Sequence, residues 1–476
     1  MKILYAASEV APFIKTGGLA DVAGVLPNVL AKQGNDVRVV LPLYSKISEQ
    51  YKSQMSLITT FYVDLSWRKQ YCGLYELVSN GVTYYFLDNE YYFNRDSLYG
   101  YDDDVERFAF FSKAILDMLP TIEFCPDIIN VNDWQTALVP TYLQVYYKFG
   151  YFYEKIKTVL TIHNIGYPGQ FGKDVLEDRI GISNFFFDNG FMELDGDVNL
   201  LKAAILSADA VNTVSETYAR EILTDYYGHG LQHILRMNSH KLHGVLNGLD
   251  IETYDPQTNK HLFHNYSSAT LKTKLKNKKD LLKLVNLEAP DKTPVIGIIS
   301  RFVSHKGFDL IERVLYDILS TDVRLVVLGT GDFKYEQMFI NAERDFPSKI
   351  SVNIAFSEDL ANKIYSGADL FLMPSVSEPC GLAQMISMRY GTLPIVRETG
   401  GLADTVIPYS KDTDTGVGFT FTNINAHDML YVINEACDLY SNEPKAFEEV
   451  VKRAMSQDFS WDKSANEYLA IYNKLV

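Results

Sequence analysis

Three cations near the ends of strand-like segments could bind a diphosphate. Arg301 and Lys306 follow an apolar run, five positions apart, on a turn that leads into a helical pattern. Arginine offers a planar fork of N–H donors and lysine a point charge, so the two together suit the neutralisation of a diphosphate. Lys15 precedes the pair Gly17-Gly18 at the start of another helical pattern, where free backbone N–H groups add donors for an anion. Each of these cations, taken alone, is also compatible with an ordinary surface position.

A second group of residues suits a sugar on which positive charge develops. Glu378 lies on a turn directly after an apolar run, where its carboxylate could accept sugar hydroxyls or balance a cation. A glutamate near a helix start also has a purely structural explanation. Asp133 and Trp134 follow another apolar run and place a carboxylate beside an aromatic face, a combination that suits sugar binding. His163 follows a third run, and a single histidine there is as often structural as catalytic.

Two clusters resemble metal sites without the pattern that a metal needs. The run Asp102-Asp103-Asp104 is similar to the acidic motif of some sugar-nucleotide transferases, but it follows a tyrosine-rich stretch and not an apolar strand. We therefore interpret it as a solvated loop. His229 and His233 are four residues apart but lack the glutamate of a zinc-binding HExxH motif. We predict no metal site and no cofactor, since a GxGxxG fingerprint after a strand is also missing.

Short apolar runs that alternate with helical patterns predict the elements that position these residues. In the N-terminal half, the strand-like runs are KILYAAS, DVRVVLP, PDIINV, IKTVLTI and ADAVNTV. In the C-terminal half, the pattern restarts with TPVIGIIS, VRLVVLG, ISVNIAF, ADLFLMP and TLPIVRE. Strands separated by helices favour βαβ units and parallel sheets, so we predict an α/β protein. Pro27 lies inside the first helical pattern and is expected to kink or interrupt it.

Turn signals in GVLNGLDIETYDP mark a boundary between the two halves. We predict an N-terminal α/β domain over residues 1–246. The C-terminal α/β domain is predicted over residues 247–456. The hexapeptide TGGLAD occurs in both halves, as Thr16–Asp21 and as Thr399–Asp404. Since ligands of open parallel sheets bind beyond the carboxyl ends of the strands, we expect the two halves to face a shared cleft.

Composition excludes several classes of protein. The chain has 476 residues and a formal net charge of −16, which disfavours nucleic-acid binding. No apolar run approaches the roughly 18 residues of a membrane helix, and MKILYAASEV is too short an apolar start for a signal peptide. Four scattered cysteines without a CxxC motif favour a reducing compartment, so we expect a cytoplasmic protein. The lysine-rich stretch over 272–283 is interpreted as a solvated helix face. Aromatic residues reach 13%, which either core packing or sugar binding could explain.

The ordered motifs resemble those of the glycogen and starch synthases, retaining glycosyltransferases of the GT-B fold, in which two Rossmann-like domains face a central cleft. The shared motifs are KTGGLADV, TIHNIGYPGQF, the SRF…KG pair and PSVSEPCGL…GTLPIVRETGGLADTV. Each motif is weak alone, but their order and spacing along nearly the whole chain are specific. The resemblance implies transfer of glucose from ADP-glucose to the non-reducing end of an α-1,4-glucan, with retention of the anomeric configuration, in glycogen biosynthesis. It implies glycogen as the partner. It also implies that both domains are Rossmann-like and that a C-terminal helix over 457–476 completes the N-terminal one.

The resemblance also implies roles for individual residues. Those expected at the donor diphosphate are Lys15, Gly18, Arg301, Lys306 and Gly381. Those expected elsewhere around ADP-glucose are Asp21, Asn247, Phe356, Glu378 and Cys380. Phe356 would contact the adenine, Glu378 the glucose hydroxyls, and His163 the region of the anomeric carbon. Asp133 and Trp134 would contact the acceptor or the reacting sugar. The catalytic set implied in this way is His163, Arg301, Lys306 and Glu378.

The chain departs from the family pattern at four positions. Gln135 stands where the family often has histidine, and Pro168 and Ala383 stand where it often has glutamine or threonine. Ile386 replaces a second glutamate that binds ribose in many retaining GT-B enzymes. None of these changes removes a charge from the expected diphosphate site.

Three other functions remain compatible with parts of the pattern. A glucan phosphorylase, or a GT-B transferase with another donor, shares the fold, although no motif for a pyridoxal phosphate lysine is present. An NAD-dependent dehydrogenase would need the dinucleotide fingerprint that is missing. A non-catalytic carbohydrate-binding protein would not need the retained charges.

Overall fold

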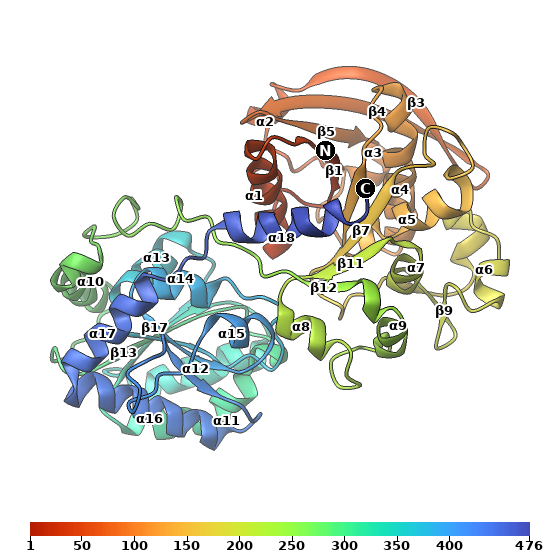
Figure 1. The fold of residues 1–476 in the computed structure, drawn as a ribbon. Helices are drawn as coiled ribbons and strands as arrows, with labels where there is room; N and C mark the ends of the chain where they lie inside the picture. The colour runs from red at the N-terminus through yellow and green to blue at the C-terminus, as the bar shows by residue number, and fades with distance from the viewer. The chain divides into compact units, whose positions relative to one another are not determined.

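The computed structural model describes all residues from 1 to 476, and they form two compact units (Figure 1). The first unit combines Met1–Gly248 with Trp461–Val476, and the second is Leu249–Ser460. The α/β architecture with parallel sheets in two units confirms the fold class expected from the sequence.

A nine-stranded sheet forms the centre of the first unit, in the order β12-β11-β7-β6-β1-β2-β5-β4-β3. Its strands are β1 (Lys2–Ala6), β2 (Asp36–Pro42), β3 (Ser56–Leu65), β4 (Arg68–Ser79), β5 (Val82–Asp88), β6 (Ile128–Asn132), β7 (Lys157–Ile162), β11 (Ala210–Thr213) and β12 (Leu242–Gly244). Neighbouring strands are parallel from β12 to β5, whereas β4 and β3 continue the sheet in antiparallel register. The order reverses between β1 and β6, so the loops after these two strands lie at a topological switch point.

Helices and a small sheet complete the first unit. The α-helices are α1 (Gly18–Lys32), α2 (Glu49–Lys52), α3 (Glu90–Phe93), α4 (Asp104–Thr121), α5 (Leu138–Tyr142), α6 (Phe185–Asp188), α7 (Leu200–Ser207), α8 (Glu216–Glu221), α9 (Gln232–Met237) and α18 (Trp461–Asn473). Shorter helical turns are η1 (Trp134–Thr136), η2 (Leu143–Tyr147), η3 (Leu176–Ile180) and η4 (Ser239–Lys241). The small sheet contains β8 (Gln170–Phe171), β9 (Glu193–Leu194) and β10 (Asp197–Asn199). Helix α1 runs through Pro27 as one element, so the expected interruption is wrong; buried side chains along α1 hold it against the sheet.

Helix α18 returns to the first unit after the chain has built the second. Figure 1 shows it, in blue, beside the red helix α1, and the two helices are in contact. The Tyr468 hydroxyl accepts a hydrogen bond from Asn212 at 3.0 Å, and the Tyr472 hydroxyl donates one to Asn130 at 3.0 Å. Both tyrosines are fully buried. The helix is therefore part of the core of the first unit and not an appendage.

The second unit is built on a six-stranded parallel sheet in the order β15-β14-β13-β16-β17-β18. Its strands are β13 (Val295–Ile299), β14 (Arg324–Gly329), β15 (Ile350–Ile354), β16 (Leu370–Met373), β17 (Leu393–Arg397) and β18 (Phe419–Phe421). Its helices are η5 (Ser268–Thr270), α10 (Leu271–Leu284), η6 (Ser304–Lys306), α11 (Phe308–Ser320), α12 (Phe333–Asp345), α13 (Glu358–Gly367), α14 (Ala383–Arg389), α15 (Gly400–Thr405), α16 (Ala426–Asn442) and α17 (Pro444–Met455). This is the Rossmann order, and its switch point lies between β13 and β16.

The lysine-rich helix α10 is not the fully solvated face that its sequence suggests. Lys274 and Lys278 are buried, and only the remaining lysines face solvent. Lys274 donates to the Thr392 hydroxyl at 2.7 Å and to the Ser366 carbonyl at 2.9 Å, while Lys278 forms an ion pair of 2.7 Å with Asp369. Burial lowers the pKa of Lys274 to about 7. These partners lie about a hundred residues further along the chain, so the local sequence could not indicate them.

Candidate active site

The charged residues of the second unit gather at its switch point. Arg301 and Lys306 follow β13, and Glu378 follows β16, the neighbouring strand in the sheet. All three lie beyond the carboxyl ends of the strands, where open α/β sheets bind ligands. Arg301 is exposed and its guanidinium forms no ion pair, so it is available to a ligand anion.

Lys306 and Glu378 form a partly buried ion pair. The Lys306 Nζ lies 2.5 Å from Glu378 Oε2, and the two side chains are 18% and 9% exposed. The Ser375 hydroxyl donates to the same carboxylate oxygen at 2.9 Å. A carboxylate with so little solvent needs such partners, because a buried charge without them is strongly unfavourable. The pair therefore presents a lysine and a glutamate in fixed positions at the switch point.

A glycine brings the two loops that carry this pair together. Gly307 ends the turn with Lys306 and has φ 80°, a conformation that favours glycine. A Cβ at this position would lie 2.0 Å from the carbonyl oxygen of Pro374. The Val376 amide also donates to the carbonyl of His305 at 2.8 Å. The turn after β13 and the loop after β16 are thus in direct backbone contact.

The two copies of TGGLAD have different surroundings. In the second copy, a Cβ on Gly400 would lie 2.0 Å from the Glu378 carbonyl oxygen, and one on Gly401 equally close to that of Cys380. These glycines let α15 approach the protein's own loop. In the first copy, a Cβ on Gly18 would meet nothing within 4 Å. Open backbone that a ligand could approach is therefore found only in the first copy.

The other donor residues expected in the second unit also lie beyond the carboxyl ends of the strands. Cys380 is buried and Gly381, with φ 75°, follows it in the loop before α14. Phe356 follows β15, the edge strand, and its side chain is 95% exposed. The ring is therefore accessible to a ligand, although single exposed apolar side chains are common on protein surfaces.

In the first unit, Lys15 and Glu9 organise the loop after β1. The Lys15 ammonium lies 2.7 Å from Asp21 Oδ1 in an exposed ion pair. Glu9 is buried, and its carboxylate accepts hydrogen bonds from the Thr16 amide and hydroxyl at 2.5 and 2.7 Å. Burial raises the pKa of Glu9. Glu9 was not among the residues expected at the site, although a carboxylate in the otherwise apolar stretch after a strand could have indicated it.

Asp133 and His163 meet at the ends of β6 and β7. Asp133, with φ 55°, accepts the His163 backbone N–H at 2.7 Å. The His163 Nε2 lies 2.9 Å from Asn132 Oδ1, an acceptor, so Nε2 carries the proton. Burial lowers the pKa of His163 to about 3 and raises the pKa of Asp133 to about 7. The imidazole is therefore neutral at pH 7, and the carboxyl titrates near that pH.

Asn247 and Trp134 stand in different environments. Asn247 follows β12, is buried, and its Oδ1 has no hydrogen-bond partner, so an acceptor is available there. Trp134 packs against Phe108 and Phe171, with ring centroids 5.2 and 5.6 Å away. A Cβ on Gly169 would lie 3.0 Å from the Trp134 side chain. Much of this indole is thus engaged by the protein itself.

The acid-rich run before α4 is structural and only partly solvated. Asp104 is the first residue of α4, is buried, and forms an ion pair with Arg107, while Asp103 pairs with Arg95 at 2.7 Å. The interpretation of this run as a solvated loop is therefore wrong beyond Asp102. Nowhere in residues 1–476 do three or more His, Cys, Asp or Glu side chains gather in a way that could hold a metal ion.

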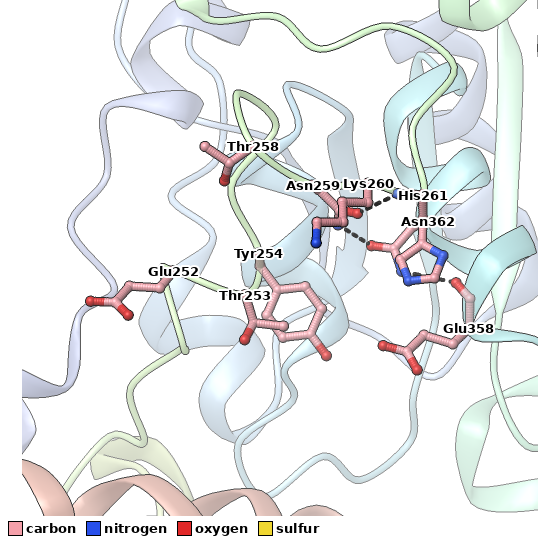
Figure 2. A pocket seen from close by; sticks show the side chains of 9 residues that line it. All are labelled: Glu252, Thr253, Tyr254, Thr258, Asn259, Lys260, His261, Glu358 and Asn362. Atoms are coloured by element: carbon pink, nitrogen blue, oxygen red, sulfur yellow. Dashed lines mark hydrogen bonds between the residues drawn. The ribbon is translucent and has the colours of Figure 1, made fainter. Parts of the chain in front are cut away.

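A pocket of about 220 Å³ also lies in the second unit (Figure 2). It is lined by Glu252, Thr253, Tyr254, Thr258, Asn259, Lys260, His261, Glu358 and Asn362. Two of these lining residues are hydrogen-bonded to each other, since the Asn259 side-chain amide donates to Asn362 Oδ1 at 2.9 Å. None of the lining residues belongs to the expected site.

Comparisons with known proteins cover both units. Residues 2–237 match the family described as the starch synthase catalytic domain, and residues 283–453 match glycosyl transferases group 1. The chain is 49% identical to a glycogen synthase of Desulforamulus reducens, covering 100% of this chain and 99% of the relative. It is 50% identical to a glycogen synthase of Ligilactobacillus salivarius, with both chains covered in full.

A solved structure gives the same result at the level of coordinates. The catalytic domain of Starch Synthase IV from Arabidopsis thaliana, bound to ADP and acarbose, matches with a TM-score of 0.91 and 32% identity. The match covers 100% of this chain and 99% of that one. Separately, no helix in the chain combines the length and apolar character that crossing a membrane requires.

Proposed function

The chain belongs to the glycogen and starch synthase family of glycosyltransferases, and from that premise we propose that it transfers glucose from ADP-glucose to an α-1,4-glucan. The acceptor is the non-reducing 4-hydroxyl of a chain such as glycogen, and the product retains the anomeric configuration. The observation that carries the proposal is the Lys306–Glu378 pair at the switch point of the second unit. It places a cation suited to a phosphate beside a carboxylate suited to sugar hydroxyls.

The second unit is proposed to bind and polarise the donor. As the bond between the glucose C1 and the diphosphate oxygen breaks, positive charge develops on the sugar and negative charge on the departing ADP. Arg301 and Lys306 stabilise the negative charge, and Glu378 accepts hydrogen bonds from glucose hydroxyls. The acceptor 4-hydroxyl forms the new bond to C1, and its proton leaves with the phosphate of ADP. Gly381 and Cys380 are assigned to the same donor because they continue the Glu378 loop.

In the first unit, Lys15, Gly18, Asp21 and Asn247 are proposed as further donor residues. The open backbone at Gly18 and the unpartnered Asn247 Oδ1 support this assignment. His163 is proposed to face the reacting sugar as a neutral imidazole, so it adds no positive charge to the one developing there. Asp133 and Trp134 are proposed as acceptor or sugar contacts.

ADP-glucose is the proposed donor because the Arabidopsis relative was solved with ADP. The exposed Phe356 ring suits an adenine, whose flat face can stack on it. Ile386 cannot hydrogen-bond a ribose, so we propose that another group serves the ribose. We also propose that the enzyme acts in the cytoplasm, because its four cysteines lie far apart in the sequence and form no CxxC motif, which favours a reducing compartment.

The test is an incorporation assay with purified full chain and glycogen. Radiolabelled ADP-glucose and UDP-glucose are supplied separately, and label retained in washed glycogen is counted. We expect label from ADP-glucose, lost again on digestion with an enzyme specific for α-1,4 bonds. Absence of incorporation from both donors, with the chain folded, would refute the proposal, and incorporation from UDP-glucose alone would refute its donor.

A further inference from the structure

Arg397 is a buried cation whose hydrogen bonds reach the loop that carries Glu378. It is the last residue of β17 and is 4% exposed. Its Nε donates to the Ser375 carbonyl at 3.0 Å, and its Nη2 donates to the Val376 carbonyl at 2.5 Å. Its Nη1 donates to the Thr422 carbonyl at 3.2 Å, directly after β18. One guanidinium thus joins the carboxyl ends of three adjacent strands, β16, β17 and β18.

The hydrogen bonds continue from this loop to the ion pair. Ser375, whose carbonyl Arg397 holds, donates from its hydroxyl to Glu378 Oε2 at 2.9 Å. That oxygen is the one that lies 2.5 Å from the Lys306 ammonium. Arg397, Ser375, Glu378 and Lys306 therefore form one connected series from β17 to the turn after β13.

The segment that Arg397 holds has no regular secondary structure to hold it otherwise. Residues 374–381 lie between β16 and α14 and contain neither a strand nor an α-helix. A planar guanidinium that donates along several directions at once can fix such a loop, whereas a lysine provides a single point of charge. Groups that act on a transition state lose much of their effect when they move by about 1 Å.

We propose that Arg397, together with Ser375, is a positioning residue that sets the direction of the Glu378 carboxylate and, through it, the place of the Lys306 ammonium. This inference rests on the proposed function, which assigns Glu378 and Lys306 to the donor. Arg397 acts through its hydrogen bonds to the loop and does not itself contact the substrate.

The experiment compares Arg397→Met, Arg397→Lys and Ser375→Ala in the full chain. Transfer from ADP-glucose is measured at varied donor concentration, and thermal unfolding is followed in parallel. Arg324→Met is the matched control, because Arg324 also donates to backbone carbonyls, those of Glu288 and Val323, but from the first residue of β14 at the opposite end of the sheet.

A positioning role predicts a loss in kcat and not in donor binding. We expect Arg397→Met to lower kcat by about tenfold or more while KM changes less than about threefold, the signature of lost transition-state contacts. Arg397→Lys should recover part of the loss, and Ser375→Ala should lower kcat in the same sense. Arg324→Met should shift the thermal midpoint without lowering kcat of the folded protein.

A second background separates positioning from general support of the fold. In Glu378→Gln chains, adding Arg397→Met should lower the residual kcat much less than it does in the unmodified chain, because residues that act through one group are not additive. Equal losses in both backgrounds, or a folded Arg397→Met chain with normal kcat, would overturn the inference. If Arg397→Met does not fold, Ser375→Ala with normal kcat overturns it instead. An unmodified chain that transfers no glucose refutes the proposed function itself, an outcome that the variants cannot mimic.

Discussion

The ammonium of Lys306 lies 2.5 Å from Oε2 of Glu378, across the ends of two strands that are neighbours in the sheet but distant in sequence. With side chains 18% and 9% exposed, the two charges depend on each other more than a surface pair does. The pair also fixes the distance between a group suited to phosphate and a group suited to sugar hydroxyls. A donor that carries both a phosphate and a sugar matches this arrangement.

Removing either cation at the switch point should abolish most of the activity. Lys306→Ala and Arg301→Ala are expected to lower kcat/KM for ADP-glucose by about 100-fold or more. Each substitution removes a positive charge that stabilises the departing diphosphate. Initial rates of glucose incorporation into glycogen measure the effect. Lys279→Ala is the control, since Lys279 is an exposed lysine of α10 paired with Asp291 at 3.2 Å. A folded Lys306→Ala or Arg301→Ala chain that turns over like the control would remove that residue from the diphosphate site.

Alanine at Gly307 should destabilise the second unit more than alanine at an open glycine does. Gly307 has φ 80° and Gly34 has φ 89°, so both substitutions carry the left-handed penalty of about 1–2 kcal/mol. Only at Gly307 does the new Cβ meet another atom, the Pro374 carbonyl oxygen at 2.0 Å. Differential scanning calorimetry of both variants should show the larger loss for Gly307→Ala, together with lower transfer activity. Equal losses would mean that the contact with Pro374 relaxes at no cost.

Asp133→Asn should make stability less sensitive to rising pH. Burial raises the pKa of Asp133 from 3.8 to about 7, so the folded chain keeps a proton that the unfolded chain has released. The stability that this proton contributes is present below pH 3.8 and is lost as pH rises through 7. Between pH 5.5 and pH 8.5 the unmodified chain should therefore lose stability relative to the variant.

Thermal midpoints of the two proteins at both pH values give the comparison. His163 has the opposite effect on how the stability of the folded chain depends on pH. Burial lowers its pKa to about 3, so the folded chain loses stability as pH falls below 6.5. Since His163 is present in both proteins, its contribution cancels in the difference. Parallel pH profiles for the two chains would show that Asp133 ionises normally.

Loss of the Phe356 ring should weaken nucleotide binding without changing stability. Phe356 is 95% exposed, so Phe356→Ala removes almost no buried surface. Stacking of a base on an aromatic ring contributes about 1–3 kcal/mol, which corresponds to a rise of about 5- to 150-fold in the Kd of ADP. Titration calorimetry with ADP measures it, and Tyr431→Ala, at another exposed ring of the second unit, serves as the control. An unchanged Kd for Phe356→Ala would place the adenine elsewhere.

Chelation should leave transfer largely intact. If Arg301 and Lys306 neutralise the diphosphate, no divalent ion is needed for that purpose. Activity after dialysis against EDTA is expected to stay within about twofold of the untreated enzyme, a difference of well under 1 kcal/mol in barrier height. Inactivation that Mg²⁺ or Mn²⁺ reverses would show that a metal shares the task.

Most of the parallel strands could be predicted because they are rich in apolar residues, whereas the parallel strands β5, β12 and β18 were not expected. β1, β2, β7 and β11 lie within the runs expected in the N-terminal half, and β6 extends one residue past its run. β13 to β17 lie within the runs expected in the C-terminal half. Strands buried on both faces need apolar side chains throughout, so their sequence is conspicuous. Polar residues that follow such runs were expected at the carboxyl ends, and Asp133, His163, Arg301 and Glu378 do follow β6, β7, β13 and β16.

The hairpin of β3 and β4 could not be predicted in the same way. Most side chains of β3 are exposed, including Tyr62 at 60% and Leu57 at 52%. An edge strand with one solvated face has neither a continuous apolar run nor a clean alternation, and a register shift between Leu57 and Thr59 disturbs the pattern further.

Contacts between distant segments were likewise hidden. Lys274 looks like any other lysine of α10 until the fold brings Thr392 to it. Arg397 lies in a strand-like run, and its tie to Ser375 depends on two strands being neighbours. Identification of such partners requires the order of the strands, which the sequence of either segment does not contain.

The return of α18 to the first unit sets an order of events during synthesis. Residues 1–248 leave the ribosome long before Trp461–Asn473, yet Tyr472 and Tyr468, which bond Asn130 and Asn212, lie in that helix. The second unit, by contrast, is one continuous segment that can fold as soon as it emerges. The surface of the first unit that α18 covers therefore stays exposed until α18 has been synthesised. During that stage chaperone binding or aggregation competes with folding of the first unit. A premature stop just before Trp461 would keep the proposed switch-point residues of the second unit. It would remove the helix that completes the core of the first unit.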